Sequence, residues 1–126
     1  MVARTMDLGD CVVWYEVFKQ DSAAPTLVFL HGAATNHTAF NHQRAHFHKA
    51  GFGSLAPDAR GYGKSTPFQN KGAYTLGAFT SDLEGLIAQE KIDKFTIVAH
   101  SGGTLVAQNY AALHPEKMES LVLVSG

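Results

Sequence analysis

The amino-acid sequence predicts an α/β protein with a mostly parallel sheet and helices on both faces of that sheet. Two observations carry this prediction. Short runs of β-branched and aromatic residues recur between turn signals, and from the second run onward they alternate with segments of helical periodicity. Alternating strands and helices favour parallel pairing, because two parallel strands must be joined by a crossover connection, which is usually a helix.

Five segments have the composition of strands. The first follows a Gly9-Asp10 turn, and the second is a continuous apolar run, which suits a strand buried on both faces of a sheet. The third is weaker and lies between two breakers, Gly51 and Pro57. The five segments are Val12 to Phe18, Thr26 to Leu30, Gly53 to Pro57, Phe95 to Ala99 and Leu121 to Val124.

Three segments between these runs are predicted as helices. The first ends at a glycine that is expected to cap it, the second places apolar residues three and four apart on one stripe, and the third stops before a proline. They are Thr38 to Ala50, Leu76 to Lys91 and Gly102 to His114, and the segment from Lys64 to Tyr74 is expected to be a surface loop.

Composition excludes several classes of protein. The 126 residues suit one domain, and 45% apolar with 17% charged residues is the composition of a globular chain. Ten basic side chains face eleven acidic ones, so nothing indicates binding to nucleic acid or to an anionic membrane. Cys11 is the single cysteine, which excludes an internal disulfide and a cysteine-based zinc site. No signal peptide and no membrane span are visible, so we expect a soluble, cytoplasmic protein.

The stretch from Phe95 to Tyr110 carries the strongest chemical signal. A buried strand runs directly into Ala99-His100-Ser101-Gly102-Gly103, and a helix follows at once. So sharp a turn crowds its own backbone and requires small residues on both sides of the central one. It presents Ser101 beside the first N–H groups of the helix, which suits a nucleophile whose attack creates an oxyanion. The plainer alternative is that Ser101 only caps a helix.

This turn resembles the nucleophile elbow of the α/β-hydrolase family, with Ala99 where the commonest form has glycine. Three further motifs in the same order strengthen the resemblance, which covers essentially the whole chain. They are His31-Gly32-Ala33 after the second strand, Asp58-Ala59-Arg60-Gly61-Tyr62-Gly63-Lys64-Ser65 after the third, and Leu113-His114-Pro115-Glu116-Lys117-Met118 before the last.

The resemblance implies a hydrolase that acts on an ester or a similar carbonyl group of a small-molecule substrate, without metal or cofactor. Ser101 would be the nucleophile, and the backbone N–H groups of Ala33 and Gly102 would bind the oxyanion. A serine at this position, rather than an aspartate, argues against the family's epoxide hydrolases and haloalkane dehalogenases. The residues expected to support the elbow and its loop are His31, Gly32, Ala99, His100 and Gly103.

Other polar motifs are interpreted as structural. Asp58 and Arg60 belong to the second motif, which lacks the strand, glycine loop and lysine of a phosphate-binding loop. His42 and His46 are one helical turn apart, a spacing that can bind metal, but a polar helix face is favoured because no second ligand cluster accompanies them.

A serine nucleophile needs a general base and an acid that orients the base, and in this family both follow the nucleophile along the chain. After Ser101 the only histidine is His114, about 20 Å away along the helix at 1.5 Å per residue, so it cannot be the base. His37 follows the oxyanion loop and could lie near Ser101, but it is not favoured as the base because the family's base follows the last strand. The resemblance therefore implies that residues 1–126 form the N-terminal half of the domain, truncated after the sixth strand, without lid and C-terminal half.

The sequence has two alternative interpretations. The chain could be a truncated, non-catalytic binding or interaction module that forms a homo-oligomer through its exposed edge strand, or a second chain could complete its fold. A nucleotide-binding Rossmann domain shares the parallel sheet, but no Gly-x-Gly-x-x-Gly follows the Thr26–Leu30 segment.

Overall fold

The computed structural model describes residues 1–67 and 74–125. Within this part of the chain, six strands form one mixed sheet in the order β1-β2-β4-β3-β5-β6. β1 pairs antiparallel with β2, and β2 pairs antiparallel with β4, whereas the β4/β3, β3/β5 and β5/β6 pairs are all parallel. The strands are β1 (Val2–Asp7), β2 (Val12–Phe18), β3 (Thr26–Leu30), β4 (Ser54–Pro57), β5 (Phe95–His100) and β6 (Met118–Val124).

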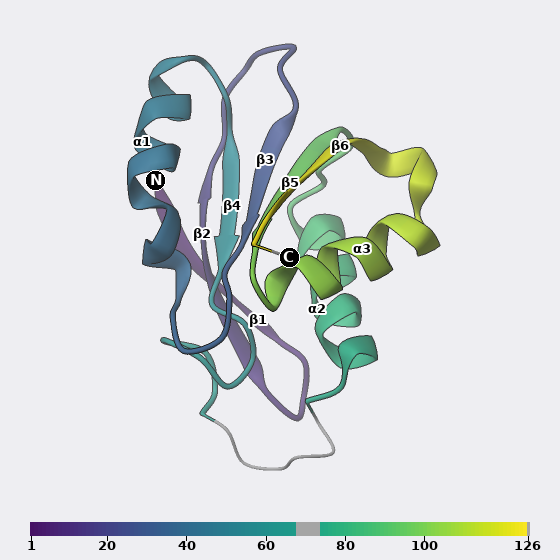
Figure 1. The fold of residues 1–126 in the computed structure, drawn as a ribbon. Helices are drawn as coiled ribbons and strands as arrows, with labels where there is room; N and C mark the ends of the chain where they lie inside the picture. The colour runs from purple at the N-terminus through teal and green to yellow at the C-terminus, as the bar shows by residue number, and fades with distance from the viewer. Residues whose placement is uncertain (68–73, 126) are drawn as a thin grey trace.

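Helices cover both faces of the sheet, as the sequence predicts (Figure 1). α1 lies on one face, and α2 and α3 lie together on the other. The helical segments are η1 (His37–Phe40), α1 (Asn41–Lys49), α2 (Leu76–Gln89), α3 (Gly103–Leu113) and the short η3 (Pro115–Lys117). The predicted loop from Lys64 to Tyr74 lies largely outside the described residues.

Local chemistry explains where the helices begin and end. The Thr75 hydroxyl accepts a hydrogen bond from the Ala78 N–H (3.1 Å) and caps the first turn of α2. Asn36 does the same for η1 through the Thr38 N–H (2.9 Å). Gly51 follows the end of α1 and is predicted from the sequence to cap it. Its φ of +95° is the left-handed conformation typical of such a cap.

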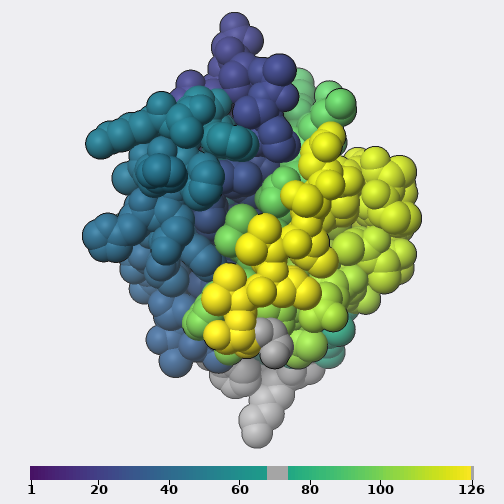
Figure 2. Space-filling view, turned by 45° about the horizontal axis from the view of Figure 1, so that its top comes forward, coloured from purple at the N-terminus to yellow at the C-terminus, as the bar shows by residue number. Residues whose placement is uncertain are grey.

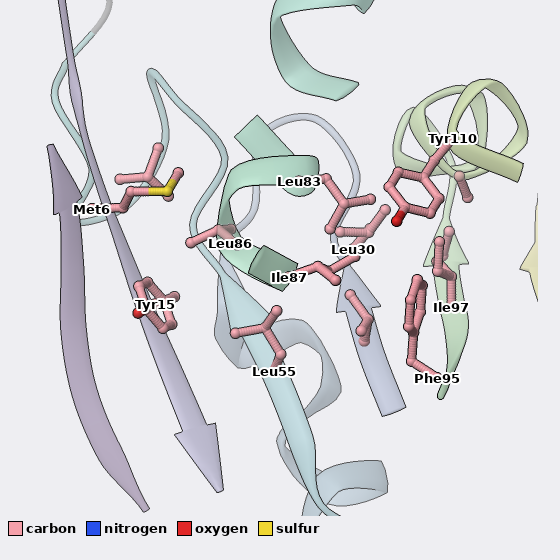
Figure 3. Close-up of a cluster of buried hydrophobic side chains, with 14 of the residues drawn as sticks. Met6, Tyr15, Leu30, Leu55, Leu83, Leu86, Ile87, Phe95, Ile97 and Tyr110 are labelled. Atoms are coloured by element: carbon pink, nitrogen blue, oxygen red, sulfur yellow. The ribbon is translucent and has the colours of Figure 1, made fainter. Parts of the chain in front are cut away.

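The larger core lies between the sheet and the α2–α3 layer. Leu83, Leu86 and Ile87 of α2 are at most 2% exposed and pack on strand side chains (Figure 3). Their spacing of three and four residues is the stripe that the sequence shows. The strand side of this core includes Tyr15, Leu30, Leu55, Phe95 and Ile97. A smaller cluster on the α1 face joins Leu27, Phe29, Phe40 and Ala56.

The topology places one crevice at the carboxyl ends of β3 and β5. The chain leaves β3 through α1 and returns in β4 on one side of it, whereas it leaves β5 through α3 and returns in β6 on the opposite side. Neighbouring strands whose connections diverge in this way leave an open crevice, where α/β proteins bind ligands. His31-Gly32-Ala33 follows β3 and Ser101 follows β5, so both motifs meet at this crevice.

β6 forms an edge of the sheet and is open to solvent within the described part of the chain. It pairs with β5 alone, and Val122 and Val124 are 46% and 43% exposed. In Figure 2 its residues (yellow) lie along the surface beside α3. The strand begins at Met118, three residues before the apolar run by which the sequence predicts it.

Candidate active site

Ser101 occupies a strained turn between β5 and α3. Its φ of +53° is in the left-handed region, which a residue with a side chain adopts at a cost of about 1–3 kcal/mol. Two sets of hydrogen bonds hold it there. The Ser101 N–H donates to the Val124 carbonyl (3.0 Å), and the Ser101 carbonyl accepts from the Thr104 N–H (3.0 Å) and hydroxyl (2.6 Å). Ser101 itself is exposed, so the turn presents its hydroxyl to solvent at the crevice.

The small residues around the turn are required by close backbone packing. A Cβ on Gly103 would lie 2.6 Å from the Leu30 carbonyl oxygen and 2.8 Å from that of His31. No side chain fits at those distances, so α3 can begin against the end of β3 only with glycine at this position. Ala99 is fully buried two residues before Ser101, where it stands in for the commoner glycine.

The loop after β3 lies directly against the serine. A Cβ on Gly32 would be 2.9 Å from the Ser101 Cβ and 3.1 Å from the His100 carbonyl oxygen. The Ala33 nitrogen is 3.9 Å from the place where a Cβ of Gly102 would be. The structure thus brings together the two residues whose N–H groups are predicted to bind an oxyanion, Ala33 and Gly102, at the end of α3 where the helix dipole is positive.

His31 braces this loop as a neutral imidazole. Its Nε2 accepts a hydrogen bond from the Ala59 N–H (3.0 Å), so its Nδ1 carries the proton and donates to the Gly32 carbonyl (2.7 Å). Burial lowers the pKa of His31, against the smaller opposing effects of the Gly32 carbonyl and the Asp58 charge. With both ring nitrogens occupied, His31 is positioned to hold the loop rather than to take a proton from Ser101.

Asp58 connects three segments at the top of the sheet. Its buried carboxylate accepts hydrogen bonds from the His37 N–H (2.7 Å), the His37 ring (2.8 Å) and the Lys64 N–H (2.8 Å), while its carbonyl accepts from the Ser65 hydroxyl. A Cβ on Gly63 would overlap the carboxylate, which explains the glycine there. The motif from Asp58 to Ser65 therefore shapes the loop above β4, which is the structural role expected from the sequence.

Arg60 has a structural role as well. Its guanidinium donates two hydrogen bonds of 2.7 Å to Asp82 in α2 and one of 3.0 Å to Asp10. Burial raises the pKa of Asp82, although the hydrogen bonds and charge of Arg60 oppose that shift. The pair fastens the loop after β4 to α2.

Five of the remaining histidines are held away from Ser101 or lie on other surfaces, whereas His100 directly precedes Ser101. The His37 ring bonds Asp58 and faces Glu16 of β2 (3.8 Å), and β2 is three strand positions from β5. The His114 ring bonds Glu84 beyond the far end of α3, and the His48 ring bonds the buried Ser54 hydroxyl (2.6 Å). His42 and His46 are exposed on α1, and His100 is half-buried beside Gly32.

Among residues 1–67 and 74–125, no group of three histidine, cysteine, aspartate or glutamate side chains converges as metal ligands would. In the same part of the chain, no helix has the length and apolar character needed to cross a membrane.

A cavity beside the elbow was not predicted from the sequence. It measures about 170 Å³, and the residues around it include Ala33, Gly102, Tyr62, Phe79 and Val106. Phe79 belongs to α2 and Val106 to α3. The position of each residue in the apolar pattern of its helix predicts only core packing. Only the assembled fold shows that both side chains are half-buried and face a space next to the oxyanion loop.

Comparison with known proteins identifies the fold family of the chain. A family model described as alpha/beta hydrolase fold matches residues 25–126. The chain belongs to the α/β-hydrolase fold family. It is 30% identical over 103 residues to epoxide hydrolase 2 of Siraitia grosvenorii, covering 82% of this chain and 33% of that protein. It is also 30% identical over 105 residues to epoxide hydrolase B of Mycobacterium tuberculosis, covering 83% and 30%.

Solved structures of α/β-hydrolase enzymes have the same arrangement of strands and helices. An epoxide hydrolase mutant of Vigna radiata superposes with a TM-score of 0.90 at 26% identity, covering 99% of this chain and 38% of that one. Epoxide hydrolase A of Mycobacterium thermoresistibile superposes at 0.84 with 28% identity, covering 97% and 38%. The chain spans about a third of the length of the curated relatives that it matches.

Proposed function

We propose that residues 1–126 carry the nucleophile and the oxyanion-binding groups of a serine hydrolase that acts on an ester or a similar carbonyl substrate. The observation that carries the proposal is the left-handed turn at Ser101, which lies against the Gly32 backbone with the Ala33 and Gly102 nitrogens beside it. A strained, exposed serine beside backbone N–H groups of a helix N-terminus and of a neighbouring loop suits acyl transfer, in which such groups stabilise the oxyanion.

In this proposal the Ser101 oxygen attacks the carbonyl carbon while its proton passes to a general base. The carbonyl electron pair moves onto oxygen, where the Ala33 and Gly102 N–H groups donate hydrogen bonds to it. The leaving alcohol then takes the proton, and water hydrolyses the acyl-enzyme. The base and its acid are assigned to a segment outside residues 1–126, either in the same polypeptide or in a second chain, because the rings of His31 and His37 are held in other hydrogen bonds.

Epoxide opening is the second candidate, because the relatives named above are epoxide hydrolases. Position 101 separates the two reactions. A carboxylate that opens an epoxide forms an ester, which water can cleave at its carbonyl carbon. A serine oxygen that opens an epoxide forms an ether, which has no carbonyl carbon for water to attack. Ser101 therefore favours acyl chemistry over turnover of epoxides.

The test is reaction of the protein with a fluorophosphonate probe, followed by mass-spectrometric mapping of the modified residue. We expect a label at Ser101, absent in Ser101→Ala, and no sustained hydrolysis of styrene oxide. Without a base the labelling is slow, because loss of the triad partners removes up to about six powers of ten in rate. A folded protein of native length that acquires no label at Ser101 would overturn the proposal and favour a non-catalytic binding module. Turnover of styrene oxide would favour the second candidate.

A further inference from the structure

The cavity beside the elbow continues into an apolar compartment between α2 and α3. A second cavity of about 50 Å³ adjoins the one of about 170 Å³, and the two share His31, Ala59, Phe79, Gly103 and Val106. The smaller cavity is lined in part by Leu30, Leu83 and Leu86, which belong to the main core. We call the joined space the α2–α3 compartment.

We propose that the α2–α3 compartment holds an apolar substituent on the carbonyl carbon of the substrate, of about the size of a phenyl ring or a short alkyl chain. This inference rests on the proposed function. It follows from position, since the larger cavity is bounded by Gly32, Ala33 and Gly102, the residues around the oxyanion site. A carbonyl whose oxygen lies at the Ala33 and Gly102 N–H groups thus has this apolar space beside it.

The lining explains the class of substituent. Phe79, Val106 and Leu30 present hydrocarbon to the space, and the His31 ring has both nitrogens in hydrogen bonds, so it contributes only its ring surface. A charged group would lose part of its hydration there, against a lining that is mostly aliphatic and aromatic. An apolar group gains roughly 25 cal/mol for each Å² that it removes from water.

The volume explains the size. An apolar cavity of about 150 Å³ lined by leucine, isoleucine and phenylalanine stays dry and binds benzene. The larger cavity here has a comparable volume of about 170 Å³, although it is partly open to solvent. A methyl substituent would leave most of it empty, whereas a benzyl or short alkyl group would fill it.

Two measurements test the inference separately from the proposed function. The first compares the rates at which Ser101 is sulfonylated by phenylmethanesulfonyl fluoride and by methanesulfonyl fluoride; the Ser101 oxygen forms the S–O bond, fluoride leaves and the proton goes to solvent base. The second is saturable binding of benzene, followed by saturation-transfer NMR, which needs no reactive serine.

The variants are Val106→Phe, which fills the compartment, and Leu105→Phe, its matched control on the adjacent, 60% exposed residue of α3. We expect Val106→Phe to abolish benzene binding and to lower the benzyl-to-methyl rate ratio at least tenfold, while Leu105→Phe leaves both unchanged. Phe79→Ala enlarges the space instead and should keep the preference for benzyl, which guards against a folding defect in Val106→Phe.

Equal benzyl and methyl rates in the wild-type protein, or benzene binding that survives Val106→Phe, would overturn the inference. If neither sulfonyl fluoride modifies Ser101, the proposed function fails, and benzene binding alone then decides whether the compartment accepts apolar groups.

Discussion

At the scale of single residues, the glycines around the elbow show what the sequence can and cannot indicate. The motif predicts small residues beside Ser101 because a sharp strand–helix turn crowds its backbone. It does not reveal the partner of each glycine. Gly103 lies against the Leu30 and His31 carbonyls of another strand, and Gly32 lies against Ser101 itself. These contacts join residues about 70 positions apart, so they could not be derived from local pattern alone.

Replacing Gly103 with alanine should therefore destabilise the protein strongly. The new Cβ would lie 2.6 Å from a backbone carbonyl oxygen, which can move only if β3 or α3 moves. We expect a loss of about 3 kcal/mol in the free energy of unfolding, the upper range for overpacking. Gly77→Ala is the matched control, because it also lies in the first turn of a helix but has only the Thr75 hydroxyl nearby, at 3.9 Å. It should be neutral or stabilising by up to about 1 kcal/mol. Urea unfolding measures both, and equal stabilities would contradict the packing argument.

At the scale of elements, the apolar runs and helical stripes predicted the interior strands and the three helices. The missed element is β1, whose sequence VARTMD buries only Met6 and pairs on one side alone. The predicted helix from Thr38 begins instead as a 3-10 turn at His37, and it buries Arg44, which no apolar stripe indicates. Edge strands and buried charged groups depend on tertiary partners, so periodicity does not find them.

The partners of one such charged group fasten α2 to the edge of the sheet. The fully buried carboxylate of Glu90, at the end of α2, bonds Arg4 of β1 (3.1 Å), the Tyr15 hydroxyl of β2 and Lys19 (3.3 Å). Burial alone would raise the pKa of Glu90, but the hydrogen bonds from Tyr15 and Lys19 and the charges of Arg4 and Lys19 outweigh it and lower the pKa below 4.5. Burial and the bond to Glu90 raise the pKa of Tyr15 to about 12.

Glu90→Gln should make the protein less stable and change how its stability depends on pH. Because the folded protein holds Glu90 ionised at lower pH than the unfolded chain does, its contribution is complete above pH 4.5 and is lost as pH falls through the folded pKa. We expect a loss of about 2 kcal/mol at pH 7, from weakened hydrogen bonds to a charged group, and a shallower acid limb. Denaturant unfolding from pH 7 to pH 3 checks this, with the exposed Glu116→Gln as control. An unchanged acid limb would rule out the assigned role of Glu90.

At the scale of the whole molecule, the sheet is covered unevenly. α1 lies over the β2, β3 and β4 side, and α2 and α3 cover the opposite face, while β6 and its Val122 and Val124 side chains stay open within the described chain. The sequence predicted an edge strand here and the family resemblance predicted the elbow and its loop. Neither indicated the α2–α3 compartment, because its lining residues come from two helices and from loops that only the folded chain brings together.

A polypeptide of these 126 residues should associate as its concentration rises. An open parallel edge with exposed valines offers both unpaired backbone groups and apolar surface to a second copy. We expect Val122→Lys to shift the weight-average mass toward the monomer in sedimentation velocity. Leu113→Lys, on a residue that is 59% exposed at the end of α3, should not. A monomer at all concentrations, or equal effects of both substitutions, would contradict the role of β6.

The hydrogen bond from the Ser101 N–H to the Val124 carbonyl links the position of Ser101 to the register of β6 against β5. β6 enters its pairing with a register irregularity opposite Phe95 and Thr96, and from there the ladder runs in step until His100 faces Val124. This register shift, at the other end of the strand pair, sets which β6 carbonyl accepts the hydrogen bond from the Ser101 N–H. The backbone of Ser101 is thus held by a strand pairing whose register is set five residues earlier in β5.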